Sequence, residues 1–296
     1  MPKRQWTGRT GGTPMMQRML IALYRLVPLW GLYGVMAVVV VFYMLLSRRS
    51  YRAVHAYYRQ IWGYGRQATL WRVYVSHFRF GQVVLDRFAV YAGKHFRLDI
   101  SGNDHFMEAA GSKEGALILG SHTGNFELCG YTLHSTEKRL NAVVFGGESQ
   151  TINDNRRRLW QGHNIGTIPV TGDMSHLFAI HRALSDGEMV CMTADRALGS
   201  NKSLTFNFLG RPADFPIGPF AVAASEGVTV LGIFVMKESM RTYHVEVRPL
   251  RLTEEEQHLP RRKQIEAYAR HYVALLEEMV RKYPDQWFNY YNFWKQ

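Results

Sequence analysis

The sequence predicts an α/β fold, a mixed sheet flanked by helices, with an N-terminal membrane-anchoring helical segment. From about residue 96 onward, short apolar or β-branched runs alternate with stretches of helical periodicity, as in α/β proteins. Residues 26–47 contain no charged side chain. With 47% hydrophobic residues in 296, the chain can bury a sizeable core.

The expected elements follow that alternation. Strands are expected at residues 116–119, 142–145, 166–170, 189–193, 228–236 and 243–250. Helices are expected at residues 126–134, 151–163, 173–186, 217–226 and 261–282. Because no repeat or Gly/Ser linker interrupts this part, we expect one α/β domain at 96–296, preceded by an anchor segment at 1–50 and a helical membrane-associated segment at 51–95.

The uncharged run from Leu26 to Ser47 is long enough to cross a hydrocarbon core of about 30 Å as a helix. Basic side chains flank it and aromatic rings lie near its ends, as in interfacial anchoring. No small-residue cleavage site follows, which favours an uncleaved anchor. A buried core helix remains an alternative because Pro28, Gly31 and Gly34 weaken the span. Residues 51–93 predict two helices packed on the anchor or lying at the membrane surface.

The charge balance limits the partners. Lys and Arg number 36 against 24 Asp and Glu, a net charge of +12, which favours nucleic acid, anionic lipid or acidic substrates. No nucleic-acid motif accompanies the basic residues, so an anionic membrane is expected and nucleic acid is not. The two cysteines, Cys129 and Cys191, form no disulfide framework, and we expect buried thiols in a reducing compartment.

A histidine and a carboxylate stand out in "GSHTGNFELCG", residues 120–130. If the preceding apolar run is a strand and Asn125 caps the next helix, then His122 lies at the strand exit and Glu127 in the first helical turn. The two side chains can then meet at the carboxyl end of a strand, where α/β sites form. A carboxylate that accepts one ring N–H leaves the other nitrogen as a base.

The proton for this base is expected to come from a substrate hydroxyl or amine. The chain has no Gly-x-Ser-x-Gly elbow and no cysteine beside a histidine, so no protein nucleophile is evident. The spacing of His122 and Glu127 suits no metal, and no metal site is expected. From spacing alone, a structural histidine remains an alternative.

Several blocks together resemble a known family. "SHTGNFE" resembles the His-x4-Asp/Glu signature of the lysophospholipid acyltransferase superfamily, in particular the branch of the lipid A late acyltransferases. "GEMVCMTADRALG", "FNFLGRPADFPIGPFAVAASEGVTVLGIFV" and the terminal "YPDQWFNYYNFW" resemble the later blocks of that branch, in the same order. The resemblance runs from the anchor to the C-terminus.

The resemblance implies a membrane-bound enzyme at the cytoplasmic face of the inner membrane. It would transfer a fatty acyl chain from an acyl carrier protein or coenzyme A thioester to a hydroxyl or amine of a lipid, without metal or nucleotide cofactor. His122 would be the general base, and Glu127 would orient it. Oxyanion donors could be backbone N–H groups of the "HTGN" turn or a nearby cation. The candidate substrate-binding residues are Asn125, Arg156, Arg157, Arg158, Asp195, Arg196, Phe208 and Gly210.

Departures from the family pattern concern the acceptor. The chain has "FPIGPF" where glycerol-phosphate acyltransferases carry a glutamate and an arginine, Phe126 replaces the usual tryptophan, and "FNYYNFW" lacks the expected basic residues. Among a lipid A precursor, an aminolipid and a polyene lipid, these departures favour the last two. A hydrolase using the same base and a non-catalytic lipid-binding protein are the alternatives. Phe208 and its neighbouring aromatics fit either an acyl channel or core packing.

Overall fold

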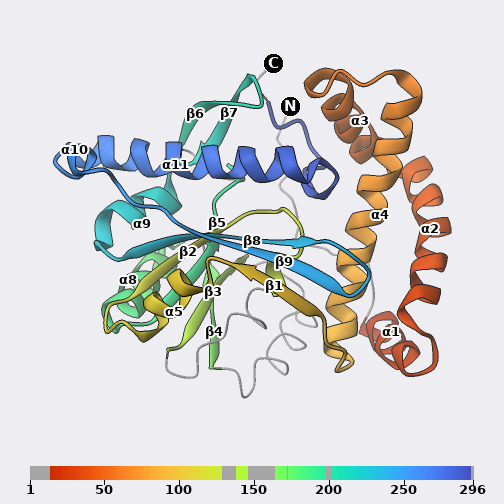
Figure 1. Ribbon diagram of the computed structural model, residues 1–296, viewed down its shortest axis with the longest axis horizontal. Coiled ribbons are helices and arrows are strands. Elements are labelled where there is room, and N and C mark those ends of the chain that lie inside the picture. The colour runs from red at the N-terminus through yellow and green to blue at the C-terminus, as the bar shows by residue number, and fades with distance from the viewer. Residues whose placement is uncertain (1–13, 129–137, 146–163, 172, 198–201, 295–296) are drawn as a thin grey trace.

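A seven-stranded mixed sheet forms the centre of the protein (Figure 1), as expected from the sequence. The computed structural model describes residues 14–128, 138–145, 164–171, 173–197 and 202–294. The strand order is β1-β9-β8-β2-β5-β3-β4, and neighbours are parallel except for the antiparallel pair β8 and β9. The strands are β1 (Arg97–Ser101), β2 (Ala116–Gly120), β3 (Leu140–Phe145), β4 (Ile165–Val170), β5 (Met189–Thr193), β8 (Thr229–Lys237) and β9 (Thr242–Pro249).

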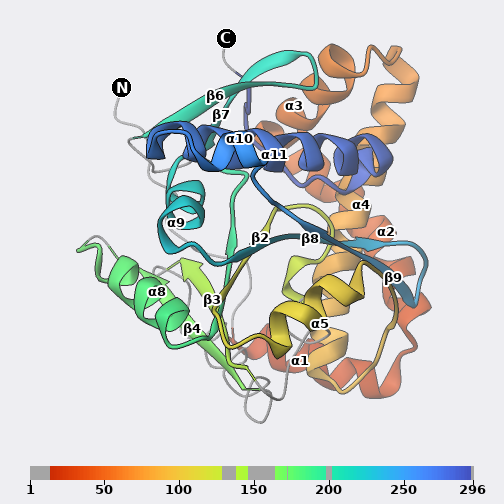
Figure 2. The same cartoon turned by 60° about the vertical axis from the view of Figure 1, so that its left-hand side comes forward.

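Helices cover both faces of this sheet because its central strands are apolar on both sides. On β2, Leu117 and Leu119 face the cluster that holds the buried side chains of α8, α9 and α11, whereas Ala116 and Ile118 face the cluster that holds those of α5. Figure 2 shows α9 and α11 on one side of the sheet and α5 on the other. The bounds are α5 (Asn103–Gly111), α8 (Ser175–Ser185), α9 (Gly218–Glu226), α10 (Glu254–Gln257) and α11 (Arg261–Lys282).

The N-terminal helices form a separate layer beside the sheet (Figure 1). They are α1 (Pro14–Leu26), α2 (Leu29–Leu46), α3 (Arg48–Ala56) with a π-helical turn (Tyr57–Ile61), and α4 (Arg66–Tyr91). The predicted anchor is therefore shorter than expected at its start, because Pro28 lacks an N–H and separates α1 from α2. The two helices predicted within 51–93 are present as the end of α3 and as α4, which packs on α2.

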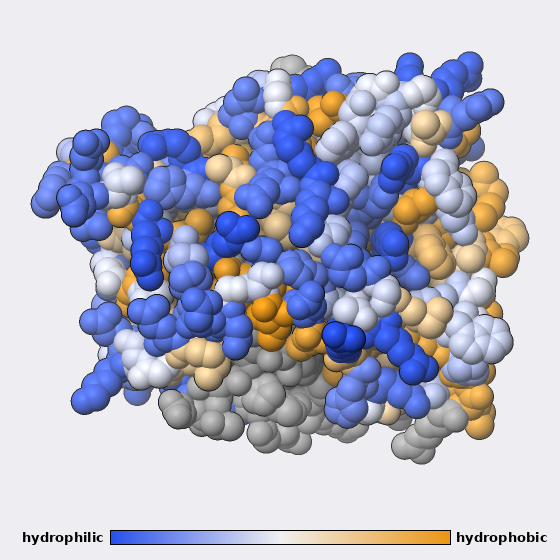
Figure 3. Space-filling model, in the orientation of Figure 1, coloured by the Kyte–Doolittle hydropathy of each residue, from blue (hydrophilic) through white to orange (hydrophobic). Residues whose placement is uncertain are grey.

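Helix α2 is the one helix in the described part of the chain that is long and apolar enough to cross a membrane. Only 17% of its residues are buried against the protein. Figure 3 shows hydrophobic side chains along the edge of the molecule formed by α2. A core helix of a soluble protein would be mostly buried, whereas α2 is mostly exposed. This exposure favours a membrane anchor over a buried core helix.

The expected strands and the expected helices at 173–186, 217–226 and 261–282 are confirmed to within a few residues. The sequence did not predict α1, α5, β1 or an antiparallel hairpin of β6 (Ser203–Phe208) and β7 (Arg211–Pro216), which packs on α11. Of the helix expected at 126–134, the described residues show a 3-10 turn at Phe126–Leu128. The rest of that range and the helix expected at 151–163 lie outside the described residues.

Candidate active site

His122 lies at the carboxyl edge of the sheet because it follows the end of β2. The neighbouring parallel strand β5 ends at the same edge, where the backbone N–H of Ala194 donates to the carbonyl of Gly120 at 3.0 Å. The next residue after Ala194 is Asp195. Parallel pairing of β2 and β5 therefore brings His122 and Asp195 together.

Asp195 holds His122 through two hydrogen bonds. The Nδ1 atom of His122 lies 2.7 Å from Oδ1 of Asp195, and the backbone N–H of His122 donates to Oδ2 at 3.1 Å. A carboxylate accepts at Nδ1, so Nδ1 carries the proton and Nε2 presents a lone pair. Nε2 has no hydrogen-bond partner within the described residues, and the imidazole is 35% exposed. The ring is thus oriented as a base that substrate can reach.

Asp195 is ionised at neutral pH although it is fully buried. Burial by itself raises the pKa of its carboxyl group, but the charge of His122, the hydrogen bonds from His122 and the charge of Arg196 hold that pKa below its usual range. The carboxylate can therefore stabilise an imidazolium when His122 takes up a proton.

The expected contact between His122 and Glu127 is not formed among the described residues. Glu127 instead forms an ion pair with Arg87 of α4, with 2.6 Å between Oε2 and Nε. The turn after His122 is tighter than a capped α-helix, because Phe126–Leu128 form a 3-10 turn. Glu127 thus contacts α4, and Asp195 from the neighbouring strand takes its expected place beside the ring.

The glycines of "GSHTGN" are explained by close approaches within this turn. Gly124 has φ +52°, and a Cβ on it would lie 2.0 Å from the carbonyl oxygen of Val235. A Cβ on Gly120 would lie 1.8 Å from the ring of Phe126. The turn therefore needs glycine at both positions to pack against β8 and to fold Phe126 back over β2.

The turn N–H groups that were expected as oxyanion donors are mostly engaged. The N–H of His122 donates to Asp195, that of Gly124 to the carbonyl of Gln286 at 2.8 Å, and that of Asn125 to the carbonyl of Val235 at 2.7 Å. These bonds fix the shape of the turn. They leave a nearby cation as the better source of oxyanion stabilisation.

The C-terminal segment adds a wall to the site that the sequence did not predict. Thr123 and Trp287 form an antiparallel bridge, and the N–H of Phe288 donates to the carbonyl of His122 at 3.0 Å. Nη2 of Arg196 donates to the carbonyl of Phe288 at 2.7 Å. The segment "QWFNYY" therefore touches both His122 and Arg196, although 92 residues separate Arg196 from Phe288.

The other predicted substrate-binding residues have structural partners. Asn125 is buried, and its Nδ2 donates to the hydroxyl of Tyr243 at 3.3 Å. Phe208 is fully buried among Phe215, Trp287, Phe293 and Trp294. Gly210, with φ +83°, lies in the exposed turn of the β6–β7 hairpin. Arg156, Arg157 and Arg158 lie outside the described residues.

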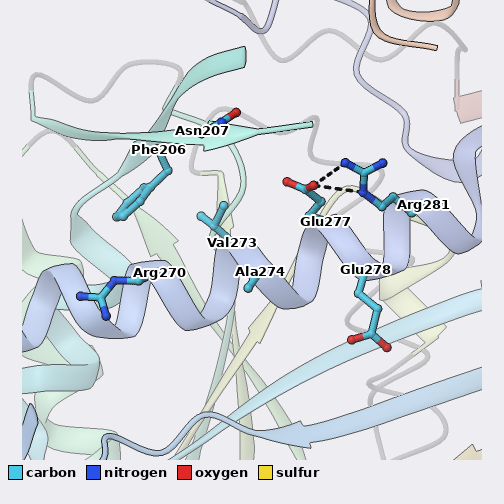
Figure 4. A pocket seen from close by; sticks show the side chains of 8 residues that line it. All are labelled: Phe206, Asn207, Arg270, Val273, Ala274, Glu277, Glu278 and Arg281. Carbon is cyan, nitrogen blue, oxygen red and sulfur yellow. Dashed lines mark hydrogen bonds and ion pairs between the residues drawn. The ribbon is translucent and has the colours of Figure 1, made fainter. Parts of the chain in front are cut away.

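A surface cavity of about 550 Å³ lies between β6 and α11 (Figure 4). Glu277 and Arg281 of its lining pair with each other at 2.6 Å, whereas Arg270 and Glu278 pair with Glu256 and Arg248 outside the lining. No hydrogen bond or ion pair among the described residues joins this lining to His122. We therefore do not assign substrate to it. Among the described residues, no group of three or more His, Cys, Asp or Glu side chains could hold a metal ion.

Comparison with known proteins identifies the family of this chain. The sequence model described as "Bacterial lipid A biosynthesis acyltransferase" matches residues 92–296, more than half of the chain. The chain belongs to the bacterial lipid A biosynthesis acyltransferase family. The match includes His122, Asp195, Arg196 and the C-terminal segment, so all parts of the described site lie within the family region.

More distant similarity links this lipid A biosynthesis acyltransferase family member to curated relatives. It is 23% identical over 133 residues to a phosphatidylinositol mannoside acyltransferase of Mycobacterium tuberculosis, covering 45% of this chain and 42% of the relative. It is 24% identical over 154 residues to the protein of the same name from Mycolicibacterium smegmatis, covering 50% of each chain. The matches thus span about half the length of these relatives or less.

Proposed function

We propose that the protein transfers a fatty acyl chain from an acyl thioester to a hydroxyl or amine of a lipid, with His122 as general base. The observation that carries this proposal is the His122–Asp195 pair at the sheet edge, with Nε2 of His122 free within the described residues. Family membership supplies the reaction class. The thioester carrier is acyl carrier protein or coenzyme A.

The arrangement supports a direct transfer. Nε2 of His122 removes the proton from the acceptor O–H or N–H, and the freed lone pair attacks the thioester carbonyl carbon. The C–S bond then breaks, and the departing thiolate takes the proton from the imidazolium. The products are an ester or amide and a free thiol. Asp195 keeps the ring oriented and stabilises its positive charge, and Arg196 contributes a cation beside the reacting atoms.

We also propose that α2 holds the enzyme in the inner membrane with the catalytic domain on the cytoplasmic side. The exposed arginines Arg48, Arg49 and Arg52 directly follow α2 and suit an anionic lipid surface. Within the family, the acceptor candidates are a lipid A precursor, an aminolipid and a polyene lipid.

The test is lipid mass spectrometry on cells of the native host that carry wild type, a gene deletion, His122→Ala or His181→Ala. His181 is the matched control because its Nδ1 also lies 2.8 Å from a carboxylate, that of Glu226, outside the site. We expect the deletion and His122→Ala to lose the same acylated lipid and accumulate its precursor, one acyl chain lighter. His181→Ala should match wild type.

Two outcomes would contradict the proposal. If His122→Ala keeps the acylated lipid that the deletion loses, then the histidine is not the base. If wild type releases free fatty acid and no lipid gains an acyl chain, then the protein is a hydrolase.

A further inference from the structure

Buried polar atoms without hydrogen-bond partners gather in the C-terminal segment beside His122. Within the described residues, three such side-chain atoms belong to this segment: Nε1 of Trp287 and both amide atoms of Asn289. A fourth, Nε of Arg196, belongs to the guanidinium that donates to Phe288. Because a buried polar atom without a partner is costly, this concentration indicates a place that a ligand completes.

Asn289 is the residue whose unpartnered atoms point most clearly to a ligand. It is 6% exposed, and both Nδ2 and Oδ1 of its amide lack a partner. A buried asparagine that served only to stabilise the fold would hydrogen-bond to the protein, as Asn141 does to Glu188 at 2.6 Å. The amide of Asn289 instead leaves two donor hydrogens and one acceptor oxygen unused.

Connectivity places the backbone of Asn289 next to the turn that carries His122. It directly follows Phe288, whose N–H donates to the carbonyl of His122 and whose carbonyl accepts from Arg196. Arg196 and Asn289 thus both adjoin the backbone segment that is hydrogen-bonded to His122. The acceptor, whose proton His122 removes, is the substrate that must come this close.

The unused atoms also define the chemistry of the group. A phosphate only accepts hydrogen bonds, so its negative charge would face the acceptor oxygen Oδ1 of Asn289 without a hydrogen between them. An ammonium group would lie next to the guanidinium of Arg196, which carries the same charge. A hydroxyl both donates and accepts, so neighbouring hydroxyls can use Nδ2 and Oδ1 of Asn289 and Nε of Arg196 together. We infer that Asn289 and Arg196 bind the hydroxylated, uncharged head group of the acceptor beside His122. This inference rests on the proposed acyltransferase function.

The test uses the full-length protein in phosphatidylcholine vesicles with Asn289→Leu as the variant. Leucine has nearly the same shape and removes only the polar atoms. Palmitoyl-coenzyme A and palmitoyl-acyl carrier protein are the donors in separate assays, and the acceptor probe is the total lipid extract of the gene-deletion strain. Asn207→Leu, an exposed asparagine of β6, is the matched control.

We expect Asn289→Leu to raise the extract concentration at half-maximal rate about 3- to 10-fold, the loss typical of a neutral hydrogen bond. The KM for the donor should stay within about twofold of wild type, and the Tm without substrate should not fall, because leucine removes polar atoms that the protein leaves unpaired. Mild alkali should release the transferred chain, because an ester to a hydroxyl is alkali-labile and an amide is not.

An unchanged acceptor KM, a donor KM that rises equally, or a lower Tm would overturn the role of Asn289. A transferred chain that survives mild alkali would overturn the hydroxyl acceptor. Two different results would contradict the acyltransferase proposal itself. In one, the wild-type protein transfers no acyl chain from either donor; in the other, His122→Ala transfers the chain as well as wild type.

Discussion

His122 and Asp195 are 73 residues apart in the chain, and Nδ1 of the histidine lies 2.7 Å from Oδ1 of the aspartate. Neither side chain is placed by a local motif alone. Each follows the end of a buried parallel strand, β2 or β5, and the strands are neighbours. The pairing of the two strands therefore places His122, the proposed base, and Asp195 at hydrogen-bond distance.

A second buried ion pair joins the N-terminal helices to the sheet. Nζ of Lys237 lies 2.5 Å from Oδ2 of Asp86, and both side chains are almost inaccessible to solvent. The hydroxyls of Tyr33 and Tyr243 also donate to Asp86, and the hydroxyl of Tyr243 accepts from Asn125 in the turn that follows β2. The network thus links α2 and α4 with the turn that carries His122.

Removing one partner of this pair should be far costlier than removing both. We expect Asp86→Ala to lower the free energy of unfolding by about 3–5 kcal/mol, because Lys237 would remain buried without a counter-charge. The double variant Asp86→Leu with Lys237→Met should recover a large part of that loss. Urea unfolding in detergent micelles measures these variants together with Asp86→Leu and Lys237→Met alone. A double variant as unstable as the sum of those two single variants would show that the pair is not coupled.

Asp195 should make the folded protein less stable as the pH falls. Its pKa is lower in the folded protein than the ordinary carboxyl value of about 3.9 in the unfolded chain. Its stabilising contribution is therefore complete above that value and is lost as the pH falls through the folded pKa. In urea unfolding from pH 6 to pH 3, wild type should lose more stability than Asp195→Asn. An equal loss in both proteins would contradict the depressed pKa.

Gly124→Ala should destabilise the protein through two effects. The left-handed φ of +52° costs a residue with a Cβ about 1–3 kcal/mol, and the new atom would also meet the carbonyl of Val235. Gly63→Ala is the matched control, because Gly63 has φ +67° and a Cβ on it would meet no atom within 4 Å. Thermal unfolding should show a larger loss for Gly124→Ala; equal losses would mean that the approach to Val235 is unimportant.

The exposed face of α2 should hold the protein in the membrane. Val38 and Phe42 are 59% and 60% exposed, one helical turn apart. Replacing both with lysine should remove the protein from carbonate-washed membranes, because each charge costs about 2.5–3.5 kcal/mol at the centre of a membrane helix. Phe178→Lys, at a residue of α8 that is 78% exposed, is the control and should stay in the membrane fraction. Retention of the double variant would rule out α2 as the anchor.

The sequence predicted the fold class and the position of His122 well, because strong apolar periodicity marks buried strands. It also included Asp195 and Arg196 among the candidate site residues. It could not predict that β5 lies directly beside β2, since strand order depends on long-range packing, and so it paired His122 with the nearer Glu127. Asn289 was not among the predicted site residues for the same reason. Only the folded structure shows that its side chain is buried and that its amide has no hydrogen-bond partner.

The measurement that tests the account most directly compares Asp195→Asn with Glu127→Gln in the acyl-transfer assay. Both changes remove one carboxylate charge and keep the shape of the side chain. The structure predicts a loss in kcat of about 10⁴-fold for Asp195→Asn, of the order found when a carboxylate that orients a catalytic histidine becomes an amide. Glu127→Gln, which weakens the contact with Arg87, should cost about tenfold or less. A greater loss for Glu127→Gln than for Asp195→Asn would show that Glu127 orients His122 during catalysis and would contradict the account.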